Sequence, residues 1–297
     1  MNKQINQKIK QIVDDIKSIS IQGATNVALA TVEGMKLVRD SGENIQTVIN
    51  IGEKLANARP NEPMAKNSVK YIKYYLKKGM DISQIIDNYK KLIQKSKLQI
   101  KSIGGKILAR YKVILTHCHS STSTAILIEA SKLNPNLKVV ATETRPRYQG
   151  RITSKELFEA GVDVTLITDS ASAAFIIDNK YLPVEAVIIG TDELLSDGTI
   201  LNKVGSYQLA QAAFLGNDDF YVTTSLLKLD IERDSTSIKI EMRDAEEVWL
   251  EAPNGLKIIN PSFDAIPPKL ITGYITEAGL LKPKEVEVMA KKIYPWI

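Results

Sequence analysis

Hydrophobic positions in the first third of the chain follow the spacing of amphipathic helices. Apolar residues recur three or four positions apart, on one predicted helix face, at Ile5, Ile9, Ile12, Val13, Ile16 and Ile19. The same spacing predicts further helices over residues 23–42, 43–58, 65–78 and 82–102. The proline-containing segment 59–63 separates two of them. The pair Gly104-Gly105 then marks the predicted end of a helical domain that covers residues 1–104.

From Gly105 onward, short apolar runs rich in β-branched residues alternate with helical runs. The predicted strands cover residues 112–117, 137–142, 163–167, 184–189 and 219–224, and the predicted helices cover 122–133, 152–160, 170–178 and 203–215. The strands are apolar on both faces, as in a parallel sheet that helices cover on each side. We therefore expect an α/β fold whose second domain, residues 105–297, is a doubly wound sheet. Its last part, 236–297, is mixed and ends in a helix after Pro283.

Composition narrows the class of protein. With 44% hydrophobic and 25% charged residues, the chain has the ordinary values of a globular protein, which excludes a disordered or fibrous one. A run of about 18 apolar residues is missing, and the first residues lack the core of a signal peptide, so we expect neither a membrane span nor export. The single cysteine fits a reducing cytoplasm. The net charge of +5 comes without a dense basic block, so nucleic acid is not an expected partner.

The predicted strands end in polar residues, and ligands of open α/β sheets bind beyond these carboxyl ends. Cys118 follows the first strand and is flanked by the only two histidines, His117 and His119. It is either a small buried hydrophobic residue or a thiolate that a helix N-terminus stabilises. A zinc site is disfavoured, because alternating side chains would turn His117 and His119 away from Cys118 and a fourth ligand is missing. We therefore expect no metal site here.

Two other strand ends carry candidate chemistry. The hydroxyl run from Ser120 to Thr124 either caps a helix or cradles a phosphate on backbone N–H groups. Asp192 follows another apolar strand and is either a turn residue or a catalytic acid or base. Asn202-Lys203 is expected to begin the next helix, and Lys228 lies beyond the last strong strand. Basic and amide groups that converge on strand ends suit a phosphorylated sugar, although each alone is more often a surface residue. Walker and GxGxxG motifs are lacking, which argues against nucleotide hydrolysis and against dinucleotide binding.

Five segments together resemble one family. They read ILTHCHSSTST, ATETRPRYQGR, VIIGTDELLSDGTILNKVG, FYVTTSLLK and NPSFDAIPPKLITGYITEAGL. The sequence is similar to the alpha, beta and delta subunits of translation initiation factor 2B, methylthioribose-1-phosphate isomerase and archaeal ribose-1,5-bisphosphate isomerase, and it most resembles the last. The resemblance covers nearly the whole chain. It implies a helical domain followed by a Rossmann-like domain, and a homo-oligomer, either dimer or hexamer.

The resemblance also implies roles for single residues. The catalytic cysteine and aspartate of the isomerases match Cys118 in THCHS and Asp192 in GTD. Positions expected to bind the phosphorylated pentose are Gln22, Gly23, Ala24, Thr25, Arg59, Ser120, Ser121, Thr122, Asn202, Lys203 and Lys228. The implied reaction converts ribose 1,5-bisphosphate into ribulose 1,5-bisphosphate by proton transfer, without metal or redox cofactor.

One departure from the family pattern keeps a second hypothesis open. The isomerases carry Arg-Gly-Ala where this chain reads Gln22-Gly23-Ala24, and an amide lacks the charge and the bidentate fork of a guanidinium. The family's Thr-Pro-Pro is also Ile266-Pro267-Pro268 here, which nothing in the sequence explains. The alternative is therefore a non-catalytic regulatory subunit that binds initiation factor 2 or senses a sugar phosphate or nucleotide. The paired Cys118 and Asp192 favour the enzyme.

Overall fold

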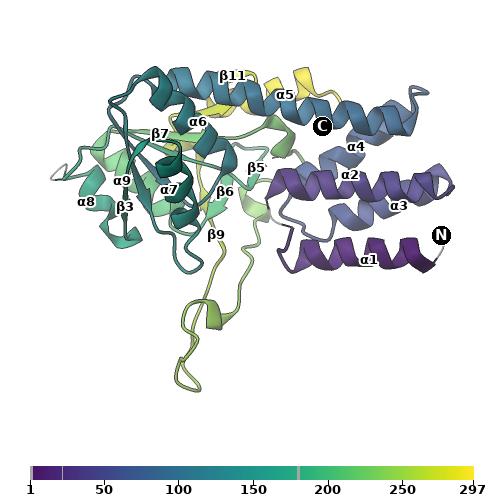
Figure 1. Ribbon diagram of the computed structural model, residues 1–297, viewed down its shortest axis with the longest axis horizontal. Helices are drawn as coiled ribbons and strands as arrows, with labels where there is room; N and C mark the ends of the chain where they lie inside the picture. The colour runs from purple at the N-terminus through teal and green to yellow at the C-terminus, as the bar shows by residue number, and fades with distance from the viewer. Residues whose placement is uncertain (1–2, 22, 179–180) are drawn as a thin grey trace. The chain divides into compact units, whose positions relative to one another are not determined.

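The computed structural model describes residues 3–21, 23–178 and 181–297 (Figure 1). These residues form two compact units. The first contains the described residues up to Ser96 together with Leu226–Ile231 and Glu287–Ile297, and the second contains Lys97–Ser225 and Glu232–Val286. The chain thus returns to the first unit twice after leaving it. Among the helices of the described residues, none is both long and apolar enough to cross a membrane.

The first unit is helical, as predicted. It is built from α1 (Lys3–Lys17), α2 (Ala24–Asp40), α3 (Ile45–Ala56), α4 (Pro63–Leu76) and the first half of α5 (Ile82–Leu108). The late segments pack into the same core: Trp296 lies edge-on to Tyr71, with ring centroids 4.8 Å apart. The amide of Asn67 in α4 donates to the carbonyls of Leu227 and Leu229, at 2.9 and 2.8 Å. This buried amide therefore fixes the backbone on both sides of Lys228.

The second unit is a doubly wound α/β sheet of the predicted class. The five predicted strands are β1 (Val113–His117), β2 (Lys138–Thr142), β3 (Asp163–Ile167), β4 (Ala186–Ile189) and β7 (Asp219–Thr223). The sheet also includes β10 (Gly273–Thr276) and β11 (Gly279–Leu281), in the order β11-β10-β7-β4-β1-β2-β3. All neighbours pair parallel except β10 and β11. The buried β1 and β4 lie at its centre.

Helices cover this sheet on both sides (Figure 1). α6 (Ser121–Leu133) packs against α7 (Gln149–Glu159), and α8 (Ser172–Ile176) packs against α9 (Ser206–Gly216). A small antiparallel sheet joins β5 (Glu193–Leu195), β6 (Ile200–Lys203) and β9 (Phe263–Ile266). The remaining elements are β8 (Leu229–Asp230), α10 (Val286–Ile293) and the short 3-10 turns η1 (Asp169–Ala171), η2 (Leu226–Lys228), η3 (Ser235–Ser237), η4 (Ala245–Glu247), η5 (Pro268–Leu270) and η6 (Pro283–Glu285).

Two boundaries differ from the sequence predictions for physical reasons. α5 does not end at residue 102 but runs through Gly104 and Gly105 to Leu108. A Cβ at these two positions would lie 2.7 Å from Ile126 and 2.6 Å from Glu129, so the glycines allow α5 to approach α6 closely. Asn202-Lys203 does not begin a helix either. It ends strand β6, and α9 begins at Ser206. The division of the chain into domains at residue 104 stays a proposal.

Candidate functional site

The strand order of the large sheet reverses between β1 and β4. From β1 the chain proceeds outward through β2 and β3, and it then crosses to β4, β7 and β10 on the other side. A crevice at such a reversal, beyond the carboxyl ends of the two strands, is where doubly wound sheets bind ligands. Cys118 follows β1 directly, and Asp192 follows β4. The two residues that we predicted to be catalytic therefore follow the two strands at the switch point.

The backbone at Cys118 is held in an unusual conformation. Its φ angle is +65°, a region that non-glycine residues rarely adopt. Two threonine hydroxyls bind the residue from either side: the Cys118 N–H donates to Oγ1 of Thr144 at 2.9 Å, and Oγ1 of Thr153 donates to the Cys118 carbonyl at 2.9 Å. The hydrogen bonds to Thr144 and Thr153 hold the Cys118 backbone, and they thereby fix the direction in which its side chain points at the end of β1.

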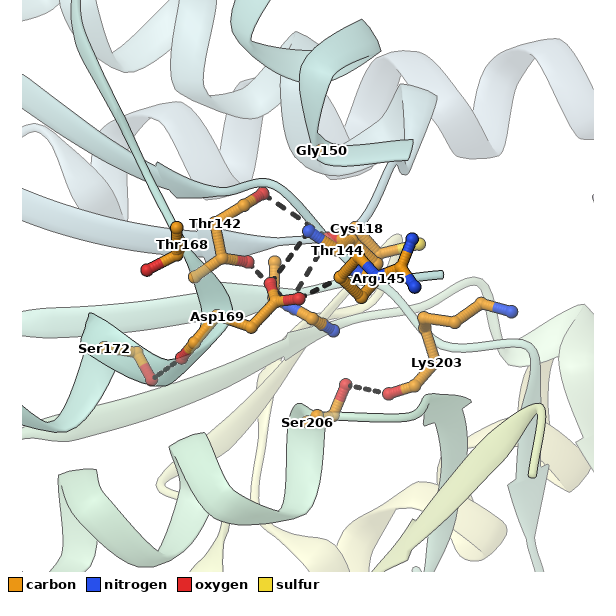
Figure 2. A network of polar contacts seen from close by, with 12 residues as sticks. Cys118, Thr142, Thr144, Arg145, Gly150, Thr168, Asp169, Ser172, Lys203 and Ser206 are labelled. Carbon is orange, nitrogen blue, oxygen red and sulfur yellow. Dashed lines mark hydrogen bonds and ion pairs between the residues drawn. The ribbon is translucent and has the colours of Figure 1, made fainter. Parts of the chain in front are cut away.

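Three charged side chains act on the Cys118 thiol. The pKa of this thiol is raised to about 12, chiefly by burial and also by the negative charges of Asp192 and Asp169, whereas the ammonium group of Lys203 and the backbone N–H of His119 lower it. The Cys118 and Lys203 side chains extend to the same side of the polar network in Figure 2. Without a bound ligand the group is a thiol at neutral pH. In the ligand-free protein burial thus favours the neutral thiol over the thiolate that a helix N-terminus would stabilise.

We predict that alkylation of ligand-free Cys118 accelerates about tenfold per pH unit from pH 7 to 9.5, because only the thiolate reacts and its fraction is small over this whole range. Since Cys118 is the only cysteine, intact mass after iodoacetamide treatment reports this residue alone. Asp192→Asn should speed the reaction and Lys203→Gln should slow it, because these changes remove charges of opposite sign. A rate that levels off near pH 8 in the native protein would contradict a raised pKa.

Both histidines are engaged away from the thiol. His117 is buried, and its Nε2–H donates to the carbonyl of Val204 at 2.9 Å. Its Nδ1 therefore accepts from Oγ1 of Thr142, at 2.6 Å, in the neutral ring. Burial lowers the pKa of His117, which keeps this ring uncharged. His119 binds Oγ1 of Thr153 through Nδ1, at 3.1 Å. The His117 bond also ties the end of β1 to the residue after Lys203.

The predicted phosphate-binding run begins α6. Ser120 caps this helix, since its Oγ accepts from the N–H of Ser123 at 3.3 Å, while Ser121 and Thr122 lie in the first turn. The end of β4 lies against this cap: a Cβ on Gly190 would lie 2.7 Å from Cβ of Ser120. Glycine at 190 therefore allows the turn that leads to Asp192 to approach the start of α6. The backbone N–H groups and hydroxyls at the start of α6 suit an anion.

Backbone bonds hold Asp192 and the β6 residues. The Asp192 N–H donates to the carbonyl of Leu201 at 2.9 Å, which joins the turn after β4 to β6. The amide of the buried Asn202 donates to Oγ of Ser206 at 2.7 Å. Lys203 is half-buried, and its Nζ lies 5.3 Å from the ring centroid of Phe263. The strand thus presents an amide and an ammonium group from adjacent positions.

The other predicted binding residues belong to the first unit. Gly23 precedes α2, with φ of +86°, and Ala24 and Thr25 begin the helix. Arg59 lies between α3 and α4 and pairs with the buried Glu62 at 3.2 Å. Lys228 ends η2 and is half-buried. Gln22 lies outside the described residues. Joint action of these residues with Cys118 and Asp192 remains a prediction.

Sequence reasoning missed the residues that support Cys118. Asp169 follows β3, and its carboxylate accepts from the backbone N–H groups of Thr144 and Arg145, at 2.8 and 2.7 Å (Figure 2). Asp169 was visible as an ionisable group at a predicted strand end, but Thr144 and Thr153 carried no such signal. Their contacts join residues about 25 to 35 positions apart, which the spacing of residues in one strand or helix does not indicate.

Known proteins match the chain over nearly its whole length. Ribose 1,5-bisphosphate isomerase from Methanocaldococcus jannaschii is 33% identical over 301 residues, which covers 97% of this chain and 96% of the relative. Methylthioribose-1-phosphate isomerase from Thermoanaerobacter sp. is also 33% identical and covers 97% of this chain and 89% of its own length. The crystal structure of 5-methylthioribose 1-phosphate isomerase from Pyrococcus horikoshii superposes with a TM-score of 0.77 at 25% identity, over 96% of this chain and 88% of that one.

A family model covers almost the same span. This model describes the initiation factor 2 subunit family, and the match extends over residues 20–283. This match covers most of both compact units and includes every predicted site residue. The chain therefore belongs to the initiation factor 2 subunit family, which its sequence motifs had indicated.

Proposed function

We propose that this protein is a sugar-phosphate isomerase that converts ribose 1,5-bisphosphate into ribulose 1,5-bisphosphate. The observation that carries the proposal is the pair Cys118 and Asp192, which follow the two strands at the switch point, together with the electrostatic effect of Asp192 and Lys203 on the Cys118 thiol. Relatives at about one-third identity include enzymes named as ribose 1,5-bisphosphate isomerases and as methylthioribose-1-phosphate isomerases. Both substrates are ribose 1-phosphates, and they differ at carbon 5.

The proposed reaction moves protons between carbons 1 and 2. Asp192 gives a proton to the ring oxygen as the bond from that oxygen to C1 breaks. The Cys118 thiolate removes the proton from C2, and the electron pair of that C–H bond forms the double bond of an enol. The thiol then returns a proton to C1 while the Asp192 carboxylate takes the proton of the C2 hydroxyl, which becomes the ketone. Both groups end in their starting states, so the cycle needs no redox partner.

The pair shares one proton during this cycle. In the ligand-free protein the proton lies on Cys118, whose pKa burial and the Asp192 charge raise. The reactive form carries it on Asp192 instead, and both forms have the same total charge. We infer that substrate binding favours the reactive form, with the Lys203 ammonium as the positive charge that stabilises the thiolate.

The remaining predicted residues supply binding and orientation. In this proposal Arg59, Lys203 and Lys228 provide the positive charge for two phosphates, and Ser120 to Thr122 offer hydroxyl and N–H groups at the start of α6. Gly23, Ala24 and Thr25 offer similar groups at the start of α2. Asn202 is fixed by Ser206. Assembly into a dimer or hexamer and a cytoplasmic location stay predictions.

Gln22→Arg should lower KM for ribose 1,5-bisphosphate about fivefold, which corresponds to about 1 kcal/mol for exchanging a neutral hydrogen bond with a charged one. The turnover number should change little, because the contact holds the ground state and the transition state alike. The gain should shrink in high salt. Calorimetry and steady-state kinetics of both proteins measure the effect. In the alternative, a regulatory subunit, arginine brings no catalytic gain, and binding to neither form would favour that alternative.

A direct substrate comparison tests the proposed function. We expect kcat/KM for ribose 1,5-bisphosphate to exceed kcat/KM for methylthioribose 1-phosphate, because the proposed cationic residues Arg59 and Lys228 would pair with a second phosphate but gain nothing from a methylthio group. The products are separated and quantified after incubation with equal enzyme. A preference for methylthioribose 1-phosphate would reassign the substrate, and turnover of neither would leave the regulatory subunit as the better account.

A further inference from the structure

The catalytic cysteine of the proposed reaction sits in a backbone conformation that its neighbours must maintain. A positive φ is energetically unfavourable at a non-glycine residue, and it persists only where the surrounding structure holds it. Cys118 is one such residue, and Thr144, which binds its N–H, is another, with φ of +64°. Two strained residues therefore support each other across the ends of β1 and β2. Something further must hold Thr144, because otherwise the strain would relax.

Asp169 supplies that support. Its two carboxylate oxygens each accept a backbone hydrogen bond, Oδ1 from Thr144 and Oδ2 from Arg145, at 2.8 and 2.7 Å (Figure 2). Asp169 is itself anchored, because Oγ of Ser172 donates to its carbonyl at 2.8 Å. Charged acceptors make stronger hydrogen bonds than neutral ones, and two bonds to adjacent N–H groups fix the orientation of the loop after β2.

The same loop has little freedom to move. Gly150, at the start of α7, approaches the end of β2 so closely that a Cβ there would lie 1.7 Å from the Thr142 carbonyl oxygen. Thr153 in α7 donates to the Cys118 carbonyl. The cysteine is thus bound on one side through Thr144 to Asp169 and on the other side to α7.

We propose that Asp169 is a positioning residue for the isomerase reaction, which holds Cys118 in its left-handed backbone conformation through Thr144. The proposal rests on the proposed function, because it assigns a role toward the cysteine of that reaction. Asp169 touches the loop rather than the substrate in this account. Its loss should therefore lower kcat and leave KM nearly unchanged, since a displacement of about 1 Å in a reacting group can cost roughly a hundredfold in rate.

Asp169→Asn tests the proposal, with Asp163→Asn as the matched control. Asparagine keeps one acceptor oxygen but brings an NH2 group against a backbone N–H and removes the charge. Asp163 begins the same strand, β3, and pairs with Lys138 at 3.7 Å at the exposed edge of the sheet. We expect kcat to fall about ten- to a hundredfold in Asp169→Asn and to stay unchanged in Asp163→Asn.

A second readout separates positioning from a merely structural role. Asp169 raises the pKa of Cys118, as do Asp192 and burial, whereas Lys203 and the His119 N–H lower it, and the neutral His117 adds no charge. Removing the Asp169 charge should therefore speed alkylation of ligand-free Cys118 while turnover falls. A general loss of folded protein would instead lower turnover and expose the thiol in proportion to the unfolded fraction, which the melting curve of the variant measures.

Thr144 provides a second pair of variants if Asp169→Asn fails to fold. Thr144→Ser keeps the hydroxyl that accepts from Cys118, and Thr144→Ala removes it, so only alanine should lower kcat. Unchanged kcat in both Asp169→Asn and Thr144→Ala would overturn the proposal. If the native protein turns over no sugar phosphate, the proposed function fails, and the alkylation rate of Asp169→Asn still shows whether Asp169 acts on Cys118.

Discussion

Cys118→Ser is expected to reduce kcat for ribose 1,5-bisphosphate by about 10³–10⁴-fold, near the upper range of what one general acid–base group contributes. Serine has nearly the size of cysteine, but its hydroxyl ionises far less readily and cannot serve as the anion that removes the C2 proton. Ligand affinity should change little, because the phosphate-binding residues remain. Steady-state kinetics and calorimetry on the same preparation measure both quantities.

The folding control for this variant is simple. Residue 118 donates its N–H to Thr144 and accepts at its carbonyl from Thr153. Both hydrogen bonds use backbone atoms of residue 118, so serine preserves them. The melting temperature should therefore stay close to that of the native protein. A folded Cys118→Ser protein with native kcat would remove the thiol from the mechanism.

Asp192→Asn is expected to reduce kcat by about 10²–10⁴-fold, because an amide cannot donate an acidic proton to the ring oxygen. The Asp192 N–H bond to Leu201 does not involve the side chain and should persist. The change also removes a negative charge that raises the pKa of Cys118. The variant should therefore combine slow turnover with faster alkylation of the thiol at an unchanged melting temperature, which distinguishes it from a misfolded protein.

Turnover and alkylation of Asp192→Asn are measured on one preparation. Asp197→Asn is the control, because it makes the same substitution five residues further along the chain. The Asp197 carboxylate binds the N–H groups of Thr199 and Ser235, and its pKa is lowered chiefly through hydrogen bonds that outweigh its burial. Its loss should affect stability rather than the Cys118 thiol. An Asp192→Asn protein that isomerises at the native rate would contradict the acid role.

The amino-acid pattern predicted the regular part of the fold because that part is determined locally. Helical spacing located α1 to α4, and β-branched apolar runs located the five strands β1, β2, β3, β4 and β7. The short strands β5, β6, β9, β10 and β11 went unpredicted, since runs of three or four residues have little periodicity of their own. Gly104-Gly105 shows the converse error: a glycine pair that favours a break in isolation instead permits close helix packing.

The candidate site, like the fold, has a part that the sequence predicted and a part that it did not. Cys118 and Asp192 could be found because they follow apolar, β-branched runs at strand ends, where α/β sheets carry their ligands. The raised pKa of the thiol could not be found, because it depends on burial and on charges from Asp169, Asp192 and Lys203, which different strands contribute. The positive φ at Cys118 and Thr144 is likewise a result of tertiary contacts. The residues predicted to be catalytic thus left a signal in the sequence, whereas of the residues that support Cys118 only Asp169 did.

The most direct test of the central claim is to follow ribose 1,5-bisphosphate by NMR during incubation with the native protein, Cys118→Ser and Asp192→Asn at equal concentration. The account predicts that the native protein forms ribulose 1,5-bisphosphate with catalytic turnover and that both variants, although folded, are slower by at least about a hundredfold. Equal rates in all three proteins, or no product from the native protein with either ribose 1,5-bisphosphate or methylthioribose 1-phosphate, would contradict it.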